Sequence, residues 1–253
     1  MKKHHWTIGL AIVFILILFV IFIARPRFAN APDHITNQLS ETVVIPLSIV
    51  SIKENSSSSP TISIEYPQFT SLDTLNKAIS SVVMDRLAEF KKDASENKVA
   101  RLATSDPKAN IPDDAYSFIT DWQQTQINNH YISLVIRFDS YTGGANEIQE
   151  LQTFNYDLYT HKIMTLSDLF PNKTNYLDTI STLSRTQLID SLKAASNGDI
   201  QIDMLNSGTE PLIVNFQNFT FNDYSITFYF PKYAVAPGSF GEQHVSIPKS
   251  AIK

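Results

Sequence analysis

Apolar residues recur along the chain of 253 residues with two different periods. A helical spacing of three to four residues runs through residues 71–95 and again through residues 175–192. A period of two, typical of half-buried strands, occupies segments before, between and after these helices. These segments are 42–53, 61–66, 116 to a turn at 128–129, 131–141, 150–159, 215–221, 224–230 and 243–247. The pattern predicts an α+β fold of antiparallel sheets with two main amphipathic helices.

The first strongly apolar segment has no such periodicity. Residues 6–24 form an uncharged run of 19 residues. As a helix at ~1.5 Å per residue, this run matches the ~30 Å hydrocarbon layer of a bilayer. We therefore predict a transmembrane helix at 6–24, with a cytoplasmic tail at 1–5 and the folded part outside the cell membrane. The alternative is a signal peptide cleaved after Ala31, but Pro32 disfavours cleavage and the apolar core is long.

Polar segments divide the remainder of the chain. Residues 25–40 are polar, contain Pro32 and are predicted to form a stalk. A second polar, proline-containing connection separates the first helical segment from the strands that follow it. We therefore predict two α+β domains, at 41–112 and at 113–253.

Charge and cysteine content narrow the classes of partner and chemistry. The net charge is −5, and the part of the chain after Phe28 holds 16 basic and 25 acidic residues. Such a domain has no general basic field for nucleic acid, so we expect no nucleic-acid partner. The absence of cysteine excludes disulfides, thiolate metal ligands and cysteine nucleophiles.

Other catalytic motifs are equally scarce. No two of the six histidines have the spacing of a helical zinc site, and no serine lies in a nucleophile-elbow sequence. We therefore expect no metal, no cofactor and no catalytic set that can be named from the sequence.

Two glycine-containing loops are distinctive because the chain has only seven glycines. The loop "YTGGAN" lies between two strand-like segments and lacks both the dinucleotide fingerprint and the P-loop lysine, so it is predicted to be a hairpin turn with positive φ. A second loop, "YAVAPG", precedes the closing strand. We hypothesise that both loops lie at one edge of the sheet and form a shared ligand surface. Its candidate residues are Tyr141, Thr142, Gly143, Gly144, Asn146, Tyr233, Pro237 and Gly238.

The same loops carry a family resemblance. The segments "FDSYTGGANEIQELQTFNYDLYTHKIMTLSDLF" and "SITFYFPKYAVAPGSFGEQHVSIP" follow in the order seen in domain of unknown function family 3298. That domain is the RsiV-like C-terminal part of several anchored bacterial proteins. The preceding strand–strand–helix segment, residues 42–95, resembles the PdaC-like domain that usually accompanies it. The family loop commonly continues Gly-Gly-Ala-His, and Asn146 stands in place of that histidine here.

The resemblance implies a role at the bacterial cell envelope. One relative is a membrane anti-sigma factor whose outer domain senses lysozyme, and another carries a peptidoglycan deacetylase as an additional domain. This chain has only five residues before residues 6–24 and no deacetylase metal motif. We interpret it as a membrane-anchored, extracytoplasmic module that binds a cell-wall glycan such as peptidoglycan, or a wall-associated protein such as lysozyme.

Two other classes remain open. A wall-modifying hydrolase would assemble Asp139, Asn146 and His244 from separate strands. A purely structural envelope protein would need no site at all. We favour the binding module over an enzyme, because the sequence contains no complete catalytic motif. Turnover of peptidoglycan would favour the hydrolase, whereas saturable binding without turnover would favour the module.

Overall fold

The structure is a computed structural model that describes residues 46–56, 59–104, 112–196 and 198–252. The predicted tail, membrane helix and stalk, at 1–5, 6–24 and 25–40, lie outside these residues. None of the helices in the described ranges is long and apolar enough to cross a membrane.

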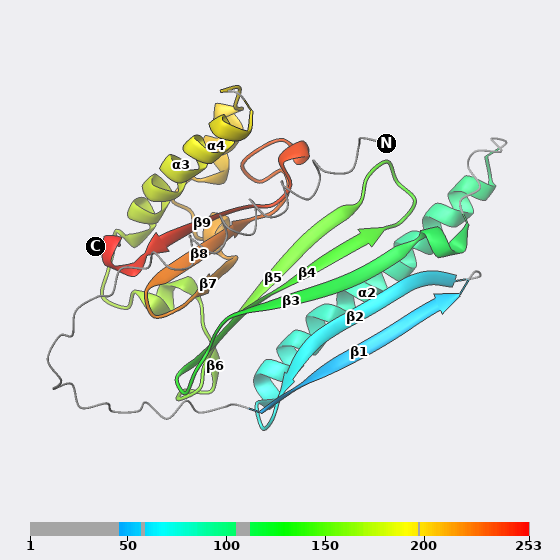
Figure 1. Cartoon of the computed structure of the whole chain (residues 1–253), viewed down its shortest axis with the longest axis horizontal. Coiled ribbons are helices and arrows are strands. Elements are labelled where there is room, and N and C mark those ends of the chain that lie inside the picture. The colour runs from blue at the N-terminus through cyan, green and yellow to red at the C-terminus, as the bar shows by residue number, and fades with distance from the viewer. Residues whose placement is uncertain (1–45, 57–58, 105–111, 197, 253) are drawn as a thin grey trace, which may run out of the picture. The chain divides into compact units, whose positions relative to one another are not determined.

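Six strands form the first sheet, and their spatial order follows their order in the chain (Figure 1). The strands are β1 (Leu47–Ser56), β2 (Ser59–Phe69), β3 (Ser117–Ile127), β4 (Tyr131–Tyr141), β5 (Ile148–Asp157) and β6 (Lys162–Ile163). Helix α2 (Asp73–Leu102) covers one face of this sheet, which confirms the first predicted helix. Its buried residues are Leu75, Ile79, Val83, Leu87, Phe90 and Ala94. This spacing of three to four residues directs one apolar stripe at the strands.

The pairing of β2 with β3 is parallel, which corrects the prediction of purely antiparallel sheets. Helix α2 connects these two strands, and it carries the chain back to the end of the sheet at which β2 began. Strand β3 therefore runs in the same direction as β2, and the sheet is mixed. All the other neighbouring pairs of this sheet are antiparallel, as predicted. The predicted domain boundary at residue 112 falls in this crossover connection and stays a prediction.

A second sheet of three antiparallel strands follows in the chain. Its strands are β7 (Phe219–Phe221), β8 (Ser225–Phe230) and β9 (Gln243–Pro248). Helix α3 (Tyr176–Ala195) packs on β9 and confirms the second predicted helix. A short helix, α4 (Ile202–Gly208), lies in a segment where the apolar pattern predicts neither a helix nor a strand. Only Leu205 of α4 is buried, so a helical period cannot be recognised there from the sequence.

Buried polar side chains join the second sheet to the first. Strand β7 lies at the edge of its sheet. On either side of it, the Asn218 carbonyl accepts a hydrogen bond from the Tyr229 N–H, and the Asn222 N–H donates to the Ser225 carbonyl. The backbone groups of Phe219 and Phe221 therefore point away from β8. They would lack partners if the first sheet did not supply them.

Three side chains of the first sheet pair with three of these four backbone groups. The Phe221 N–H donates to Ser133 Oγ (2.8 Å), and the Phe219 N–H donates to Thr153 Oγ1 (3.2 Å). Asn155 Nδ2 donates to the Phe219 carbonyl (2.8 Å), and Asn155 Oδ1 accepts from Ser133 Oγ (2.6 Å). We call Ser133, Thr153 and Asn155 the polar joint. All three are buried, so the joint holds β7 at one position on the face of the first sheet.

Candidate functional site

An open cleft of about 430 Å³ lies between the two sheets. Strands β4 and β5 form one wall, and the connection from β8 to β9 forms the other. We call it the charged cleft; its lining residues are Arg137, Asp139, Gln149, Glu150, Leu151, Pro231, Lys232, Glu242 and His244. Such a mixed, mostly polar lining suits a polar ligand.

The alternation of β4 positions the cleft. Its even-numbered residues, such as Ile136 and Phe138, are buried in the core under α2. Because successive side chains of a strand point to opposite faces, Arg137 and Asp139 lie on the other face. In β5, Leu151 is paired with Arg137. The sheet thus presents one cation and one carboxylate toward the second sheet.

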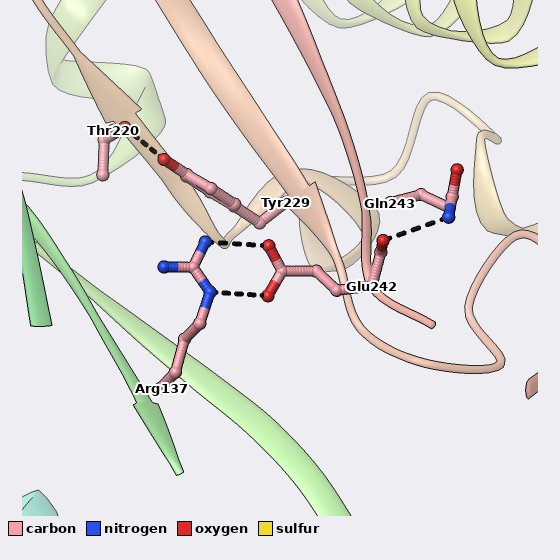
Figure 2. Close-up of polar contacts among 5 residues, drawn as sticks. All are labelled: Arg137, Thr220, Tyr229, Glu242 and Gln243. Carbon is pink, nitrogen blue, oxygen red and sulfur yellow. Dashed lines mark hydrogen bonds and ion pairs between the residues drawn. The ribbon is translucent and has the colours of Figure 1, made fainter. Parts of the chain in front are cut away.

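A bidentate ion pair closes one side of the cleft. The Nε and Nη2 atoms of Arg137 donate to the two carboxylate oxygens of Glu242, at 3.0 and 2.9 Å (Figure 2). The guanidinium carbon lies 5.6 Å from the centre of the Tyr229 ring. The Tyr229 hydroxyl is bonded in turn to Thr220 Oγ1 (3.1 Å). The pair therefore ties the β8–β9 connection to β4, across 105 residues of chain.

The pair also stabilises the charged form of Arg137. The hydrogen bond to Glu242 raises the pKa of Arg137 above its ordinary value; burial opposes this shift, and the charge of Glu242 adds to it. Gln243 Nε2 donates to the backbone carbonyls of Phe240 (2.7 Å) and Glu242 (3.0 Å), which holds the end of the connection. The β8–β9 connection is thus held both by the ion pair with Arg137 and by the hydrogen bonds of Gln243.

Of the remaining charged or titratable groups of the lining, Glu150 has an ion pair, whereas Asp139, Lys232 and His244 have none with a residue that the structure describes. The Asp139 carboxylate has no hydrogen bond or ion pair with another residue that the structure describes. The exposed His244 contacts the Tyr229 ring at 6.3 Å between centroids. Lys232 Nζ lies 5.6 Å from the Tyr233 ring centre. Glu150 is paired with Arg86 of α2, at 2.8 Å.

The lining contains three carboxylates, an imidazole, an ammonium group and a guanidinium but no serine, threonine or cysteine. The imidazole and the carboxylates are groups that can activate a water molecule as a general base. Within the described ranges, no three histidine, aspartate or glutamate side chains gather closely enough to hold a metal ion.

The "YTGGAN" loop is the hairpin turn that the sequence predicted, since it connects the antiparallel strands β4 and β5. Gly143 has φ +87°, whereas Gly144 does not have positive φ, so the expected conformation applies to one glycine of the pair. A Cβ on Gly143 would lie 3.0 Å from the Tyr116 ring. Thr142 is buried and lines a small cavity of about 110 Å³ beside α2. Tyr141 is half-buried at the end of β4, and Asn146 is exposed.

The second predicted loop has its own packing. Tyr233 has φ +72° and a side chain that is 59 % exposed. Its ring covers Gly238, where an added Cβ would come within 2.3 Å of the ring carbon Cζ. Gly238 is therefore needed for close approach and not for positive φ. Pro237 lines a separate cavity of about 140 Å³.

The structure thus places the two predicted loops beside different cavities. None of the eight candidate residues lines the charged cleft, although Asp139 precedes Tyr141 by two residues and Lys232 precedes Tyr233 by one. Of the three residues proposed for a hydrolase, Asp139 and His244 lie in the cleft together and Asn146 does not line it. The shared ligand surface of the two loops stays a prediction.

The sequence analysis missed Arg137, Glu242 and Lys232 as site residues. A usable signal existed in β4, where the even-numbered residues from Ile132 to Phe138 are apolar and Arg137 and Asp139 alternate with them. Charged residues on the second face of a strand whose first face is core indicate a surface open to solvent or to a ligand. Nothing in the sequence indicated that Glu242 would be the partner of Arg137.

The two sheets and their helices define an α+β fold with the charged cleft between the sheets. Comparison with protein families identifies the two parts. Residues 52–148 match the family model described as Deacetylase PdaC, and residues 167–250 match Protein of unknown function (DUF3298). The chain therefore contains a PdaC domain followed by a DUF3298 domain, which confirms the resemblance. The "YTGGAN" loop falls within the PdaC match.

Two curated proteins are similar in sequence. The chain is 28 % identical over 192 residues to the Peptidoglycan-N-acetylmuramic acid deacetylase PdaC of Bacillus subtilis, which covers 75 % of this chain and 38 % of the deacetylase. It is 31 % identical over 120 residues to an esterase of Mycobacterium tuberculosis, covering 47 % of this chain and 50 % of the esterase. The matched region is thus half or less of each relative.

Two crystal structures share the fold. A DUF3298 family protein of Pseudomonas aeruginosa superimposes with a TM-score of 0.60 at 14 % identity, covering 82 % of this chain and 92 % of that one. A DUF3298 family member of Bacteroides fragilis gives a TM-score of 0.52 at 19 % identity, covering 81 % and 92 %. At these identities the likeness concerns the fold alone.

Proposed function

We propose that the chain is a cell-wall-modifying hydrolase whose charged cleft removes acyl groups from a wall glycan. The observation that carries the proposal is that Asp139, His244 and Lys232 line one open cleft. In the proposed reaction, His244 accepts a proton from a water molecule, and the resulting hydroxide attacks the acyl carbon. Lys232 stabilises the negative charge on the acyl oxygen, and Asp139 stabilises the protonated imidazole. The bond from the acyl carbon to the oxygen or nitrogen of the glycan then breaks, the imidazolium of His244 donates its proton to that leaving atom, and the acyl group departs as the free carboxylic acid.

The names of the two curated relatives support this choice. One is a deacetylase of a peptidoglycan sugar and the other is an esterase, and both activities remove an acyl group with water. Since the chain covers 38 % and 50 % of these proteins, their activities enter here as a proposal for this chain. The predicted membrane helix at 6–24 would place the cleft on the outer side of the membrane, next to the wall.

Acetate release from acetylated peptidoglycan, with p-nitrophenyl acetate as a soluble ester probe, tests the proposal. We expect turnover by the full chain and a loss of about 10²-fold or more in kcat/KM in both His244→Ala and Asp139→Asn. Gln68→Ala is the matched control, because Gln68 is exposed on β2 and does not line the cleft. Equal rates in the wild-type chain and His244→Ala would rule out this site.

A second candidate is the binding module predicted from the sequence. Residues after Phe28 hold 25 acidic and 16 basic side chains, and Asp139 offers an unpaired carboxylate in the cleft. This charge favours a cationic wall-associated protein such as lysozyme. Saturable binding of such a protein, in a chain that shows no acetate release, would replace the hydrolase with the binding module.

A further inference from the structure

A second cavity shares a residue with the charged cleft. It has a volume of about 300 Å³, and Pro231 lines both cavities. The end of α4, the segment before β7 and the end of β8 form its walls. We call it the amide cavity; its lining residues are Ser207, Gly208, Val214, Asn215, Gln217, Asn218, Tyr229, Phe230, Pro231 and Ala234. Tyr229 also stands between the two cavities, because the cleft residue Arg137 lies over its ring.

The chemistry of the amide cavity differs from that of the cleft. Its lining contains no charged side chain but three side-chain amides. The amide of Asn215 is engaged, since its Nδ2 donates to the carbonyls of Ser207 (3.0 Å) and Glu210 (3.1 Å). The side-chain amides of Gln217 and Asn218 make no hydrogen bond to any residue that the structure describes. Gln217 is exposed and Asn218 is half-buried, so both can reach a ligand.

These groups match the hydroxyl-rich surface of a neutral sugar. A side-chain amide offers a donor and an acceptor on neighbouring atoms, and each sugar hydroxyl is likewise both a donor and an acceptor. Tyr229, Pro231 and the exposed Val214 supply apolar surface for the C–H faces of a sugar ring. A charged ligand would find no counter-charge in this cavity.

We propose that the two cavities form one continuous groove across Pro231 and that this groove binds an extended glycan. One sugar unit, carrying the acyl group, lies in the charged cleft, and a neighbouring neutral unit lies in the amide cavity. The inference rests on the proposed function for the glycan nature of the ligand, and it does not require that the chain turn the ligand over. It makes Gln217 and Asn218 determinants of substrate length.

Calorimetric titration of the full chain with peptide-free glycan strands tests the groove. The probes are a disaccharide and a tetrasaccharide prepared from peptidoglycan. We expect the tetrasaccharide to bind about tenfold more tightly, because only the longer chain reaches the amide cavity. In the Gln217→Ala/Asn218→Ala double variant, the affinity for the tetrasaccharide should fall to that for the disaccharide. Gln68→Ala should keep the wild-type preference.

The outcomes separate this inference from the proposed function. Loss of the length preference in the double variant supports the groove, whether or not the wild-type chain releases acetate. Equal affinity for the two lengths in the wild-type chain overturns it, even if the cleft is hydrolytic. Tighter binding of a sugar-free wall stem peptide than of the tetrasaccharide also overturns it, since the amide cavity would then be a peptide site. The melting temperature should be unchanged in the double variant, because neither side-chain amide makes a hydrogen bond to a residue that the structure describes.

Discussion

Gly143 sets the shape of the β4–β5 hairpin at the scale of a single residue. Its φ of +87° is in the region that residues with a Cβ avoid, and its would-be Cβ meets the Tyr116 ring at 3.0 Å. Gly144 has no positive φ, and the nearest atom to its would-be Cβ is 3.9 Å away. The two adjacent glycines therefore have different roles, which their sequence alone does not distinguish.

This difference predicts unequal effects of one substitution at two neighbouring positions. Gly143→Ala should lower the free energy of unfolding by about 1–2 kcal/mol, because alanine resists positive φ and its methyl group crowds Tyr116. Gly144→Ala should change it by less than about 0.5 kcal/mol. Urea unfolding of both variants measures the two effects. A larger loss in Gly144→Ala than in Gly143→Ala would contradict the backbone conformation described here.

At the scale of the element, a carboxylate organises the turn from β5 to β6. Asp157 Oδ1 accepts from the backbone N–H groups of Tyr159 (2.8 Å) and Thr160 (3.0 Å). Burial acts to raise the pKa of Asp157, but these bonds and the charge of His161 outweigh it and lower the pKa below 3.8. The ionised carboxylate is therefore favoured in the folded state relative to the unfolded chain.

The lowered pKa predicts how stability changes in acid. The contribution of Asp157 is complete above the pKa of the unfolded state and is lost as the pH falls through the lower, folded pKa. Asp157→Asn keeps an oxygen acceptor for the turn but cannot titrate. Between about pH 5 and about pH 2, the wild-type chain should therefore lose stability more steeply than the variant. Urea midpoints across this range measure both slopes, and parallel curves would show that Asp157 is not the titrating group.

The elements themselves were largely predictable from periodicity. Helices α2 and α3 bury a continuous stripe of apolar residues, and such long repeats dominate any local preference. Helix α4 could not be predicted, because its seven residues include one buried position and therefore show no helical repeat of apolar residues. The parallel pairing of β2 with β3 escaped because a hydrophobic pattern shows which face of a strand is buried but not its direction.

At the scale of the whole molecule, the polar joint couples the two sheets. Asn155 is 2 % exposed and bonds both Ser133 and the carbonyl of Phe219. Asn155→Ala leaves the Ser133 hydroxyl hydrogen without its acceptor and the buried Phe219 carbonyl without its donor, which should cost about 1–3 kcal/mol. Gln68→Ala, at an exposed position, is the control.

Hydrogen exchange is the measurement that tests the coupling. Amides in β8 and in β4 should lose protection together in Asn155→Ala, since one joint holds both sheets. Loss of protection confined to β5 would show that the effect of the substitution is local and that the sheets unfold independently.

The site was less predictable than the fold, because it depends on distant parts of the chain. The alternation in β4 indicates that Arg137 and Asp139 share a face, and this much is visible in the sequence. Glu242 and His244 reach the same cleft only because β7 is docked on the first sheet. That docking depends on Ser133, Thr153 and Asn155, whose polar character marks solvent-facing positions in an ordinary two-layer pattern. Because the second sheet covers this face, these polar side chains are buried and not exposed to solvent.

The same docking has a consequence for self-association. An edge strand with free N–H and carbonyl groups is a template on which a strand from another molecule can add, and this is a common route to aggregation. In β7 the outward N–H groups of Phe219 and Phe221 and the carbonyl of Phe219 already have partners in side chains of the same molecule. A foreign strand would have to displace those partners before it could pair, so the docking of β7 protects this edge of the second sheet against strand addition.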